Sequence, residues 1–437
     1  MVAMRLAKQL RSALRDIRWK RIHDFGPEEN VFPEGQAPVL SERPNLDLAV
    51  IALDGEGNLL DAANVILSRD QPHGLISKLD TNLSTTNIRW QRWNQKRWDG
   101  ARSWITTPDD LPAGEQLGTS PSSEAETVFM SPYPASLFKL PLAFFLLEET
   151  ATERIALSDI RKPLRQMLTV SSNQATNDLL KTLHDNGRIS AMNRRFKRLG
   201  LETIQIEGTD PETGGDWNVG EITMTSMDTA KLLWLIQSDP ESPPLWMQPN
   251  GKQPRSRLTS QGQRILLRHL GNQAFSETLS TANFGVGGNS SDSIKTPRNI
   301  EPGIPSRVPT KFIDAITGEV AFNYEGFPIN YGEDVRPYNN TIASKDFLHK
   351  TGLTYNFGSD AGILRDEQTR DSPSYIISFI SNLGFRYTDP AFADRKSYPV
   401  YDDPGPIAYV QEIPRLGNSV DQRMDDLFSS LNNSGHI

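Results

Sequence analysis

The sequence predicts an α+β fold, in which an antiparallel sheet built from both ends of the chain is flanked by helices. Two apolar runs near the start, 46–53 and 58–66, have the length of strands and are joined by a turn. Three more strand-like runs follow near the end, at 347–356, 361–366 and 374–381. The segments between them have helical spacing. Strands at both ends with helices between them are typical of an antiparallel sheet with a helical subdomain.

Composition limits the function classes. The 437 residues are 37% hydrophobic and 23% charged, which is enough for a sizeable core. The net charge of -8 gives no electrostatic footprint for nucleic acid, so no nucleic-acid partner is expected. The absence of cysteine excludes disulfides, thiolate metal sites and a cysteine nucleophile. No apolar run approaches the ~18 residues of a membrane helix, so no integral membrane segment is expected.

Residues 1–45 are predicted to form an N-terminal amphipathic helix and a linker, ahead of one large domain at 46–430. The apolar stripe of the helix consists of Leu6, Leu10, Leu14 and Ile17. Such a stripe usually faces a core, so docking on the protein or on a partner subunit is favoured over a membrane-surface helix. Residues 25–45 are rich in Pro, Glu and Gly and are predicted to be the linker.

Two long insertions are predicted in the large domain. The first, 67–130, holds a basic aromatic cluster of Trp90, Trp93, Trp98 and Trp104 with interleaved Arg and Lys. Such a cluster can stack bases or sugars. On an acidic protein the packing of aromatic rings with Arg stems is the favoured interpretation. Residues 107–135 are predicted to be a long loop. The second insertion, 281–343, is loop-rich and contains a small hairpin at 320–324 and 327–330.

The helical pattern between the strands has several parts. Predicted helices are 140–147, 160–185, 188–199, 225–237 and 259–270, with a closing helix at 420–431. A Gly-rich acidic loop at 208–222 separates the third and fourth of these.

Ser136 and Lys139 stand three residues apart where a helix begins. Residues at this spacing share a helix face, so the Lys139 amine can reach the Ser136 hydroxyl. A serine needs an adjacent base to become a nucleophile, and a desolvated lysine can supply one. An isolated S-x-x-K is a weak signal, because chance produces about one or two in a chain this rich in Ser and Lys.

Two further motifs follow in order. Ser171, Ser172 and Asn173 come after the helical segment MLTV, and Lys350-Thr351-Gly352 lies in a strand-like run. The ordered set S-x-x-K, S-x-N, K-T-G resembles the class A β-lactamases and penicillin-binding proteins. The flanks LTVSSNQATNDLL, LGLETIQIEGTDPE and SDAGIL are also similar to that family. The resemblance implies the β-lactamase/transpeptidase fold, with a three-layer α/β/α arrangement.

The residues and the resemblance together assign roles. Ser136 is the candidate nucleophile and Lys139 its base, with a pKa lowered by burial and by Lys350 nearby. Lys350 should also attract a substrate carboxylate. The resemblance implies that Ser171 relays a proton to the leaving nitrogen, and that Asn173 holds Lys139 and the substrate amide.

The resemblance also assigns the substrate-binding strand. It implies an oxyanion hole from the backbone N–H groups of Ser136 and Leu353, beside Gly352. Thr351 and Thr354 are candidate carboxylate binders, and for Thr354 an ordinary strand threonine is an equal interpretation.

Departures from the family pattern concern local hydrogen bonding, one wall of the site and deacylation. Ser172 replaces the usual Asp, and Ser136 and Ser171 are only 35 residues apart, which predicts a reduced wall of the site. Asp210 stands where the water-activating Glu is expected, with Glu212 and Glu207 as substitutes. An Asp is one methylene shorter, so hydrolysis of an acyl-enzyme is expected to be slow.

The sequence therefore predicts a serine hydrolase of β-lactamase type, acting on a small-molecule β-lactam, peptide or ester acyl donor. A DD-peptidase, esterase or acyltransferase, and a penicillin-binding sensor without turnover, remain as alternatives. No metal or cofactor is expected, since the histidines lack ligand spacing. The N-terminus lacks the continuous apolar core of a signal peptide, so either the protein is expected to be cytoplasmic or the given start omits an export signal. The oligomeric state is left open.

Overall fold

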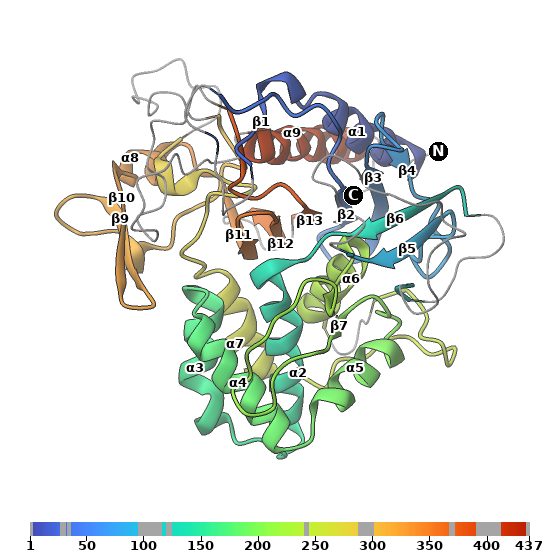
Figure 1. Ribbon diagram of the computed structural model, residues 1–437, viewed down its shortest axis with the longest axis vertical. Helices are drawn as coiled ribbons and strands as arrows, with labels where there is room; N and C mark the ends of the chain where they lie inside the picture. The colour runs from blue at the N-terminus through green and yellow to red at the C-terminus, as the bar shows by residue number, and fades with distance from the viewer. Residues whose placement is uncertain are drawn as a thin grey trace.

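The computed structural model describes residues 3–26, 32, 36–94, 116–118, 125–239, 244–286, 301–366, 372–389 and 412–433. Its centre is a six-stranded antiparallel sheet in the order β11-β12-β13-β2-β3-β4 (Figure 1). The strands are β2 Leu46–Leu53, β3 Leu59–Leu67, β4 Leu75–Ile76, β11 Lys345–Leu353, β12 Gly358–Asp366 and β13 Ser374–Ser381. The predicted α+β class is confirmed, and β13 begins and ends where the sequence predicts.

Both faces of the sheet are covered. Along β2, Ala49, Ile51 and Leu53 belong to one core cluster, while the alternate residues Leu48 and Val50 belong to a second. This follows from the period of two, because successive strand side chains point to opposite faces. The result is a three-layer α/β/α arrangement.

One outer layer is made by the two ends of the chain. Helix α1, Ala3–Arg15, packs on β3 and on α9, Glu412–Asn433 (Figure 1). The predicted apolar stripe of α1 is buried against this face of the sheet. Docking on the protein itself is therefore the correct alternative for α1. Helix α9 is longer than the predicted 420–431. Within the described residues, no helix is long and apolar enough to span a membrane.

The other layer is the helical subdomain, below the sheet in Figure 1. Helix α6 lies against β2, β12 and β13, and α7 contacts β11. Helix α6 begins after Thr225 and α7 after Thr259, whose hydroxyls accept backbone N–H groups of the first turn. The helices are α2 Lys139–Ala151, α3 Leu157–Thr169, α4 Asn173–Asp185, α5 Ile189–Arg198, α6 Ser226–Gln237 and α7 Ser260–Leu270.

Some predicted boundaries are wrong. The predicted helix 160–185 is two helices, because the chain breaks between Thr169 and Asn173 with Ser171 in the left-handed region at φ 57°. The predicted loop 107–135 contains strand β6, Thr127–Ser131, which pairs in parallel with β5, Ile88–Arg92.

The two insertions are partly described. Trp90 and Trp93 are buried, in agreement with the packing interpretation, whereas Trp98 and Trp104 lie outside the described residues. The second insertion contains the predicted hairpin, β9 Glu319–Tyr324 and β10 Phe327–Asp334, and an additional helix α8, Arg336–Thr341. The hairpin projects at the left of Figure 1.

The remaining short elements connect these parts. They are β1 His23–Asp24 paired with β14 Tyr387–Thr388, β7 Gln205–Ile206 paired with β8 Ile222–Thr223, and the 3-10 helices η1 Trp19–Arg21, η5 Ala135–Phe138, η6 Ala282–Phe284 and η7 Thr310–Phe312.

Candidate active site

Ser136 lies in η5, one turn before the apolar helix α2. It is partly exposed, whereas the residues on both sides of it are buried. Ala135 has a positive φ of 48°, a strained conformation for a residue with a Cβ. Among the described residues, no hydrogen-bond partner holds the Ser136 hydroxyl. The hydroxyl is therefore available at the surface of an otherwise rigid turn.

Lys139 is completely buried at the start of α2. Its Nζ donates to the Ser171 carbonyl at 2.6 Å and to Asn173 Oδ1 at 2.7 Å, and lies 3.4 Å from Ser171 Oγ. The ring of Trp217 lies 5.2 Å from Nζ. Burial lowers the pKa of Lys139 well below its ordinary value, and the charge of Lys350 lowers it further, while Glu325 opposes both. A lysine whose charged form is disfavoured in this way is suited to act as a base.

Lys350 is the second buried amine. Its Nζ donates to Ser171 Oγ at 2.9 Å and to the Thr351 carbonyl at 2.7 Å. Burial lowers the pKa of Lys350 to about 7, although the carboxylates Asp360 and Glu277 raise it. Ser171 Oγ thus lies between two amines, which suits a group that passes a proton.

The break between α3 and α4 places Ser171. Its left-handed backbone ends the α3 segment, and the next residue, Ser172, caps α4 by accepting the Ala175 N–H at 3.1 Å. Ser172, the departure from the family pattern, therefore has the local capping role. Asn173 follows as the first residue of α4 and points its amide oxygen at Lys139.

Gly352 is required by close packing of η5 on β11. A Cβ at this position would lie 2.4 Å from the Pro134 carbonyl oxygen and 2.7 Å from the Leu137 nitrogen. The Ser359 hydroxyl also donates to the Pro134 carbonyl at 2.6 Å. The turn that carries Ser136 is thus pressed against the end of β11, where Leu353 follows Gly352.

The two candidate carboxylate binders differ in position. Thr351 is buried in β11, between Lys350 and Gly352. Thr354 lies just beyond the strand and lines a cleft, where its hydroxyl accepts the Phe357 N–H at 3.1 Å. That contact is also the local turn bond expected of an ordinary threonine.

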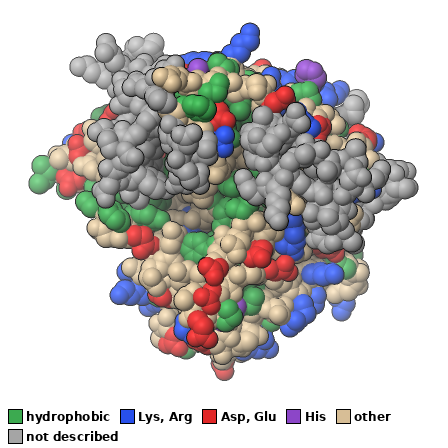
Figure 2. Space-filling model, in the orientation of Figure 1, with side chains coloured by type: hydrophobic (Ala, Val, Ile, Leu, Met, Phe, Trp, Pro, Cys, Tyr) green, Lys and Arg blue, Asp and Glu red, His purple; other side chains and the backbone are tan. Residues whose placement is uncertain are grey.

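The cleft has a volume of about 510 Å³. Asn173 and Asn177 of α4 line it, together with Tyr133, Gly215, Asp216, Trp217, Val219, Thr354, Tyr355, Asn356 and Phe357. Figure 2 shows a hollow near the centre of this face and acidic side chains gathered below it. Aromatic walls and amide groups suit an organic substrate rather than a metal ion.

Asp210 is not brought together with these groups by any contact of the described residues. Its carboxylate accepts the Glu212 N–H at 2.8 Å and the Thr213 hydroxyl at 2.9 Å, within its own loop. These contacts lower the pKa of Asp210. Of the substitutes, Glu207 pairs with Arg92. Asp216, which the sequence did not single out, is the carboxylate that lines the cleft.

The sequence also missed the contribution of the β9–β10 hairpin. Tyr324 and Glu325, at its tip, contact Asn173 across 151 and 152 residues of sequence. Trp217, stacked edge-on against Phe138 at 5.1 Å, was likewise not singled out. A long-range contact of this kind leaves no local pattern in the sequence.

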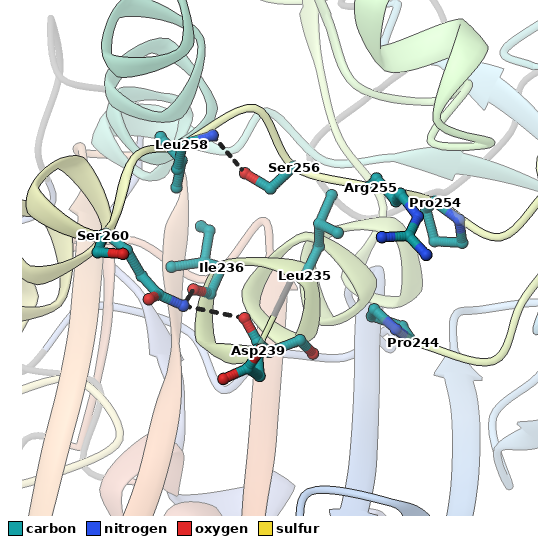
Figure 3. A pocket seen from close by; sticks show the side chains of 11 residues that line it. Leu235, Ile236, Asp239, Pro244, Pro254, Arg255, Ser256, Leu258 and Ser260 are labelled. Carbon is teal, nitrogen blue, oxygen red and sulfur yellow. Dashed lines mark hydrogen bonds between the residues drawn. The ribbon is translucent and has the colours of Figure 1, made fainter. Parts of the chain in front are cut away.

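A smaller hollow of about 60 Å³, between the end of α6 and the start of α7, shares no lining residue with the cleft (Figure 3). There Gln263 donates to the carbonyls of Ile236 at 2.8 Å and Ser238 at 3.0 Å. These bonds satisfy carbonyl groups at the end of α6 that have no partner within the helix.

No protein-family model and no curated protein matches the chain. Matching solved structures include a class A β-lactamase from Bacteroides cellulosilyticus (10% identity, 98% of this chain and 99% of that chain, TM-score 0.43). A β-lactamase from Xanthomonas campestris matches at 11% identity over 97% and 98%, with a TM-score of 0.42. The penicillin-binding protein PBP-A matches at 14% identity over 89% and 93%, with a TM-score of 0.39. Sequence identities and TM-scores this low do not assign a function to this chain.

Proposed function

We propose that this protein is a serine hydrolase that forms an acyl-enzyme at Ser136, with β-lactams as the first choice of substrate. The observation that carries the proposal is the group of two buried amines on one hydroxyl: Lys139 and Lys350 both approach Ser171 Oγ. Burial of two lysine amines costs stability because it disfavours their charged forms. Groups with pKa values shifted in this way gather at functional sites.

In the proposed acylation step, Lys139 acts on Ser136, which lies in η5 just ahead of α2. The hydrogen bonds of the Lys139 amine in this structure go to Ser171 and Asn173. Neutral Lys139 takes the proton of the Ser136 hydroxyl while Oγ bonds to the substrate carbonyl carbon. The backbone N–H groups of Ser136 and Leu353 receive the developing oxyanion, and one such donor is typically worth about 2.7–4 kcal/mol. The C–N bond then breaks, and the proton passes from Lys139 through Ser171 to the leaving nitrogen.

In this proposal, substrate recognition uses Asn173 and Thr354, which line the cleft, together with the buried residues Lys350 and Thr351 of β11. Charged Lys350, with Thr351 and Thr354, attracts the carboxylate of a β-lactam or peptide. Asn173 holds the substrate amide. These are the residue types that a carboxylate-bearing amide requires, since a point charge and hydrogen-bond donors together fix its orientation.

Deacylation is the slow step of the proposed reaction. Water attacks the acyl carbon and restores the Ser136 hydroxyl with release of an acid. The assignment of Asp210 as the base for this water remains a hypothesis from the sequence, and its loop contacts do not favour it. Because the Asp210 carboxylate is bound within its own loop, a penicillin-binding sensor that is acylated without turnover is the second candidate.

Mass spectrometry over time with a penicillin tests the proposal. We expect an adduct of the penicillin mass, mapped to the peptide that contains Ser136, which then decays slowly. Ser136→Ala should form none. An adduct on another residue, or none with penicillins, esters and peptides alike, would remove the assignment of the nucleophile. A stable adduct would favour the sensor, and reaction with esters or peptides alone would favour an esterase or peptidase.

A further inference from the structure

The tip of the β9–β10 hairpin has an unfavourable residue for its turn. Tyr324 pairs directly with Phe327, so the turn consists of Glu325 and Gly326 alone. Both have positive φ, 50° and 90°. A two-residue turn of this kind favours Asn-Gly, Asp-Gly or Gly-Gly, whereas Glu in the left-handed region is strained. Strain at one residue points to a use for its side chain.

The Glu325 carboxylate is used at the start of α4. Its Oε1 accepts the Asn173 N–H at 2.5 Å and the Gln174 N–H at 3.3 Å. These are the first two residues of a helix of 13 residues, whose N-terminal N–H groups have no partner within the helix. The carboxylate thus fixes the backbone that carries Asn173.

The tip also holds the Asn173 side chain. The Asn173 Nδ2 donates to the Tyr324 hydroxyl at 3.1 Å, while its Oδ1 accepts from Lys139 Nζ at 2.7 Å. Both ends of the amide are therefore fixed, one by the hairpin and the other by the candidate base. This contact also decides the orientation of the amide, because its oxygen must face Lys139.

The hairpin itself is anchored beside the cleft. The Phe275 ring contacts Phe322 and Tyr324 edge-on at 4.9 and 5.7 Å. The cluster around Phe275 includes Leu353 and Tyr355, at the end of β11. The β9–β10 hairpin is thus packed against the end of β11, the strand that carries Lys350 and Gly352.

We propose that Glu325 is a positioning residue of this site, which fixes the first turn of α4 and thereby holds Asn173 against Lys139. The inference rests on the proposed function, because Lys139 is the base there.

The charge of Glu325 has a second consequence. The charged groups that act on Lys139 are Lys350, from β11, and Glu325, from the hairpin, while the other groups facing its amine, on Ser171, Asn173 and Trp217, are uncharged. Lys350 disfavours the charged amine and Glu325 favours it. Removal of the Glu325 charge should therefore lower the pKa of Lys139.

The test uses Glu325→Gln and Glu325→Asn, with Glu319→Gln as the control. Glu319 lies in the same hairpin, and its carboxylate accepts from Asn330 rather than from a site residue. Glu325→Asn creates the favoured Asn-Gly turn, so the hairpin should be at least as stable as in wild type. NMR titration of the full-length protein with ε-¹³C lysine reports the pKa of Lys139 without any substrate, and stopped-flow acylation by a chromogenic cephalosporin reports the rate.

We expect both Glu325 variants to lower the Lys139 pKa and to slow acylation about 10- to 100-fold, as for a misplaced catalytic group. The acid limb of the acylation rate should move to lower pH, and Glu319→Gln should match wild type. A slower acylation rate with an unchanged Lys139 pKa would make the hairpin tip merely structural and overturn the proposal. An unchanged acylation rate together with an unchanged Lys139 pKa would also overturn it. If no acyl donor acylates the wild-type protein, the proposed function fails. The Lys139 titration still decides whether Glu325 acts on this amine.

Discussion

At the scale of the residue, the two buried lysines of the candidate site have different partners and, in the proposed reaction, different tasks. Lys139 is held by the Ser171 carbonyl and Asn173, whereas Lys350 is held by Ser171 Oγ and by its own strand. The carboxylates of Glu277 and of Asp360 favour the charged form of Lys350. Asp360 lies in β12 and also accepts from His349 at 2.8 Å. This arrangement suits a neutral base beside a charged anion binder.

Lys350→Ala should weaken recognition of anionic substrates more than that of neutral esters. A point charge opposite a carboxylate matters only when the carboxylate is present. The measurement is kcat/KM for a penicillin and for an uncharged activated ester. The loss common to both reports the effect of Lys350 on Lys139, and the excess loss for the penicillin reports recognition. Equal losses for the two substrates would contradict the anion-binding role.

The low pKa of Lys350 also predicts a pH dependence of stability. Its pKa of about 7 in the folded protein lies below the ~10.4 of an unfolded lysine. Between these values the unfolded state binds more protons, so the free energy of unfolding rises with pH. The cost of the buried amine is fully present below about pH 7 and is lost as pH rises towards about 10, at roughly 1.4 kcal/mol per pKa unit.

Lys350→Met, which removes the amine, should therefore raise the free energy of unfolding relative to wild type near neutral pH. This advantage should shrink as pH rises towards about 10. Urea unfolding at a series of pH values measures it, with the exposed Lys8→Met as the matched control. A difference between Lys350→Met and wild type that is independent of pH would contradict the lowered pKa.

At the scale of the element, the contact of η5 with β11 sets the position of Ser136. Gly352→Ala places a methyl group within 2.4 to 2.7 Å of Pro134, Leu137 and Ser359. We expect a loss of about 1–3 kcal/mol, typical of overpacking, and a fall in acylation rate as η5 moves away. Gly271→Ala is the control, because its Cβ would meet atoms only at 3.5 Å or more. Unchanged acylation in Gly352→Ala would show that η5 is not held by this contact.

Asp210→Asn tests whether the Asp210 carboxylate serves deacylation or only its own loop. With a cephalosporin we expect a burst of product followed by slow turnover. Because the Asp210 carboxylate caps its own loop, Asp210→Asn should keep both phases close to their wild-type rates. Rapid-mixing kinetics separates the phases. Selective loss of the slow phase would instead establish Asp210 as the base that the sequence suggested.

The break between α3 and α4 shows why some element boundaries escape sequence analysis. The apolar spacing runs on from Ile160 to Leu183, so the pattern alone predicts one helix. In the structure, Ser171 adopts φ 57° where Lys139 and Lys350 bond to it. Tertiary contacts decide this conformation, and no local residue preference encodes it. The three motifs were nevertheless sufficient to predict that these residues meet.

At the scale of the whole molecule, the sheet could be predicted because its strands are short apolar runs bounded by turns. The antiparallel partners β2 and β13 come from opposite ends of the chain, as expected. The parallel pair β5 and β6 and the reach of the hairpin to α4 could not be predicted, because each depends on packing between distant segments. The sequence therefore predicted that residues of the three motifs lie together better than it predicted the segments around them.

The docking of α1 closes the outer layer and leads to the last prediction. Leu10 is completely buried among residues of the sheet and of α9. Leu10→Ala should lower the free energy of unfolding by about 2–5 kcal/mol, the range for a large-to-small change in a core. Urea unfolding measures this loss, and the exposed Lys8→Ala on the same helix should have little effect.

The same helix was the candidate for a membrane surface, so vesicle flotation belongs to this test. A membrane-surface helix needs its apolar stripe free to enter the lipid, whereas the apolar stripe of α1 is buried against the sheet. Wild type should therefore remain unbound to anionic vesicles under conditions in which it is folded. Binding of folded wild type, together with a negligible effect of Leu10→Ala on unfolding, would mean that α1 leaves the sheet, and that the chain ends do not form one layer in solution.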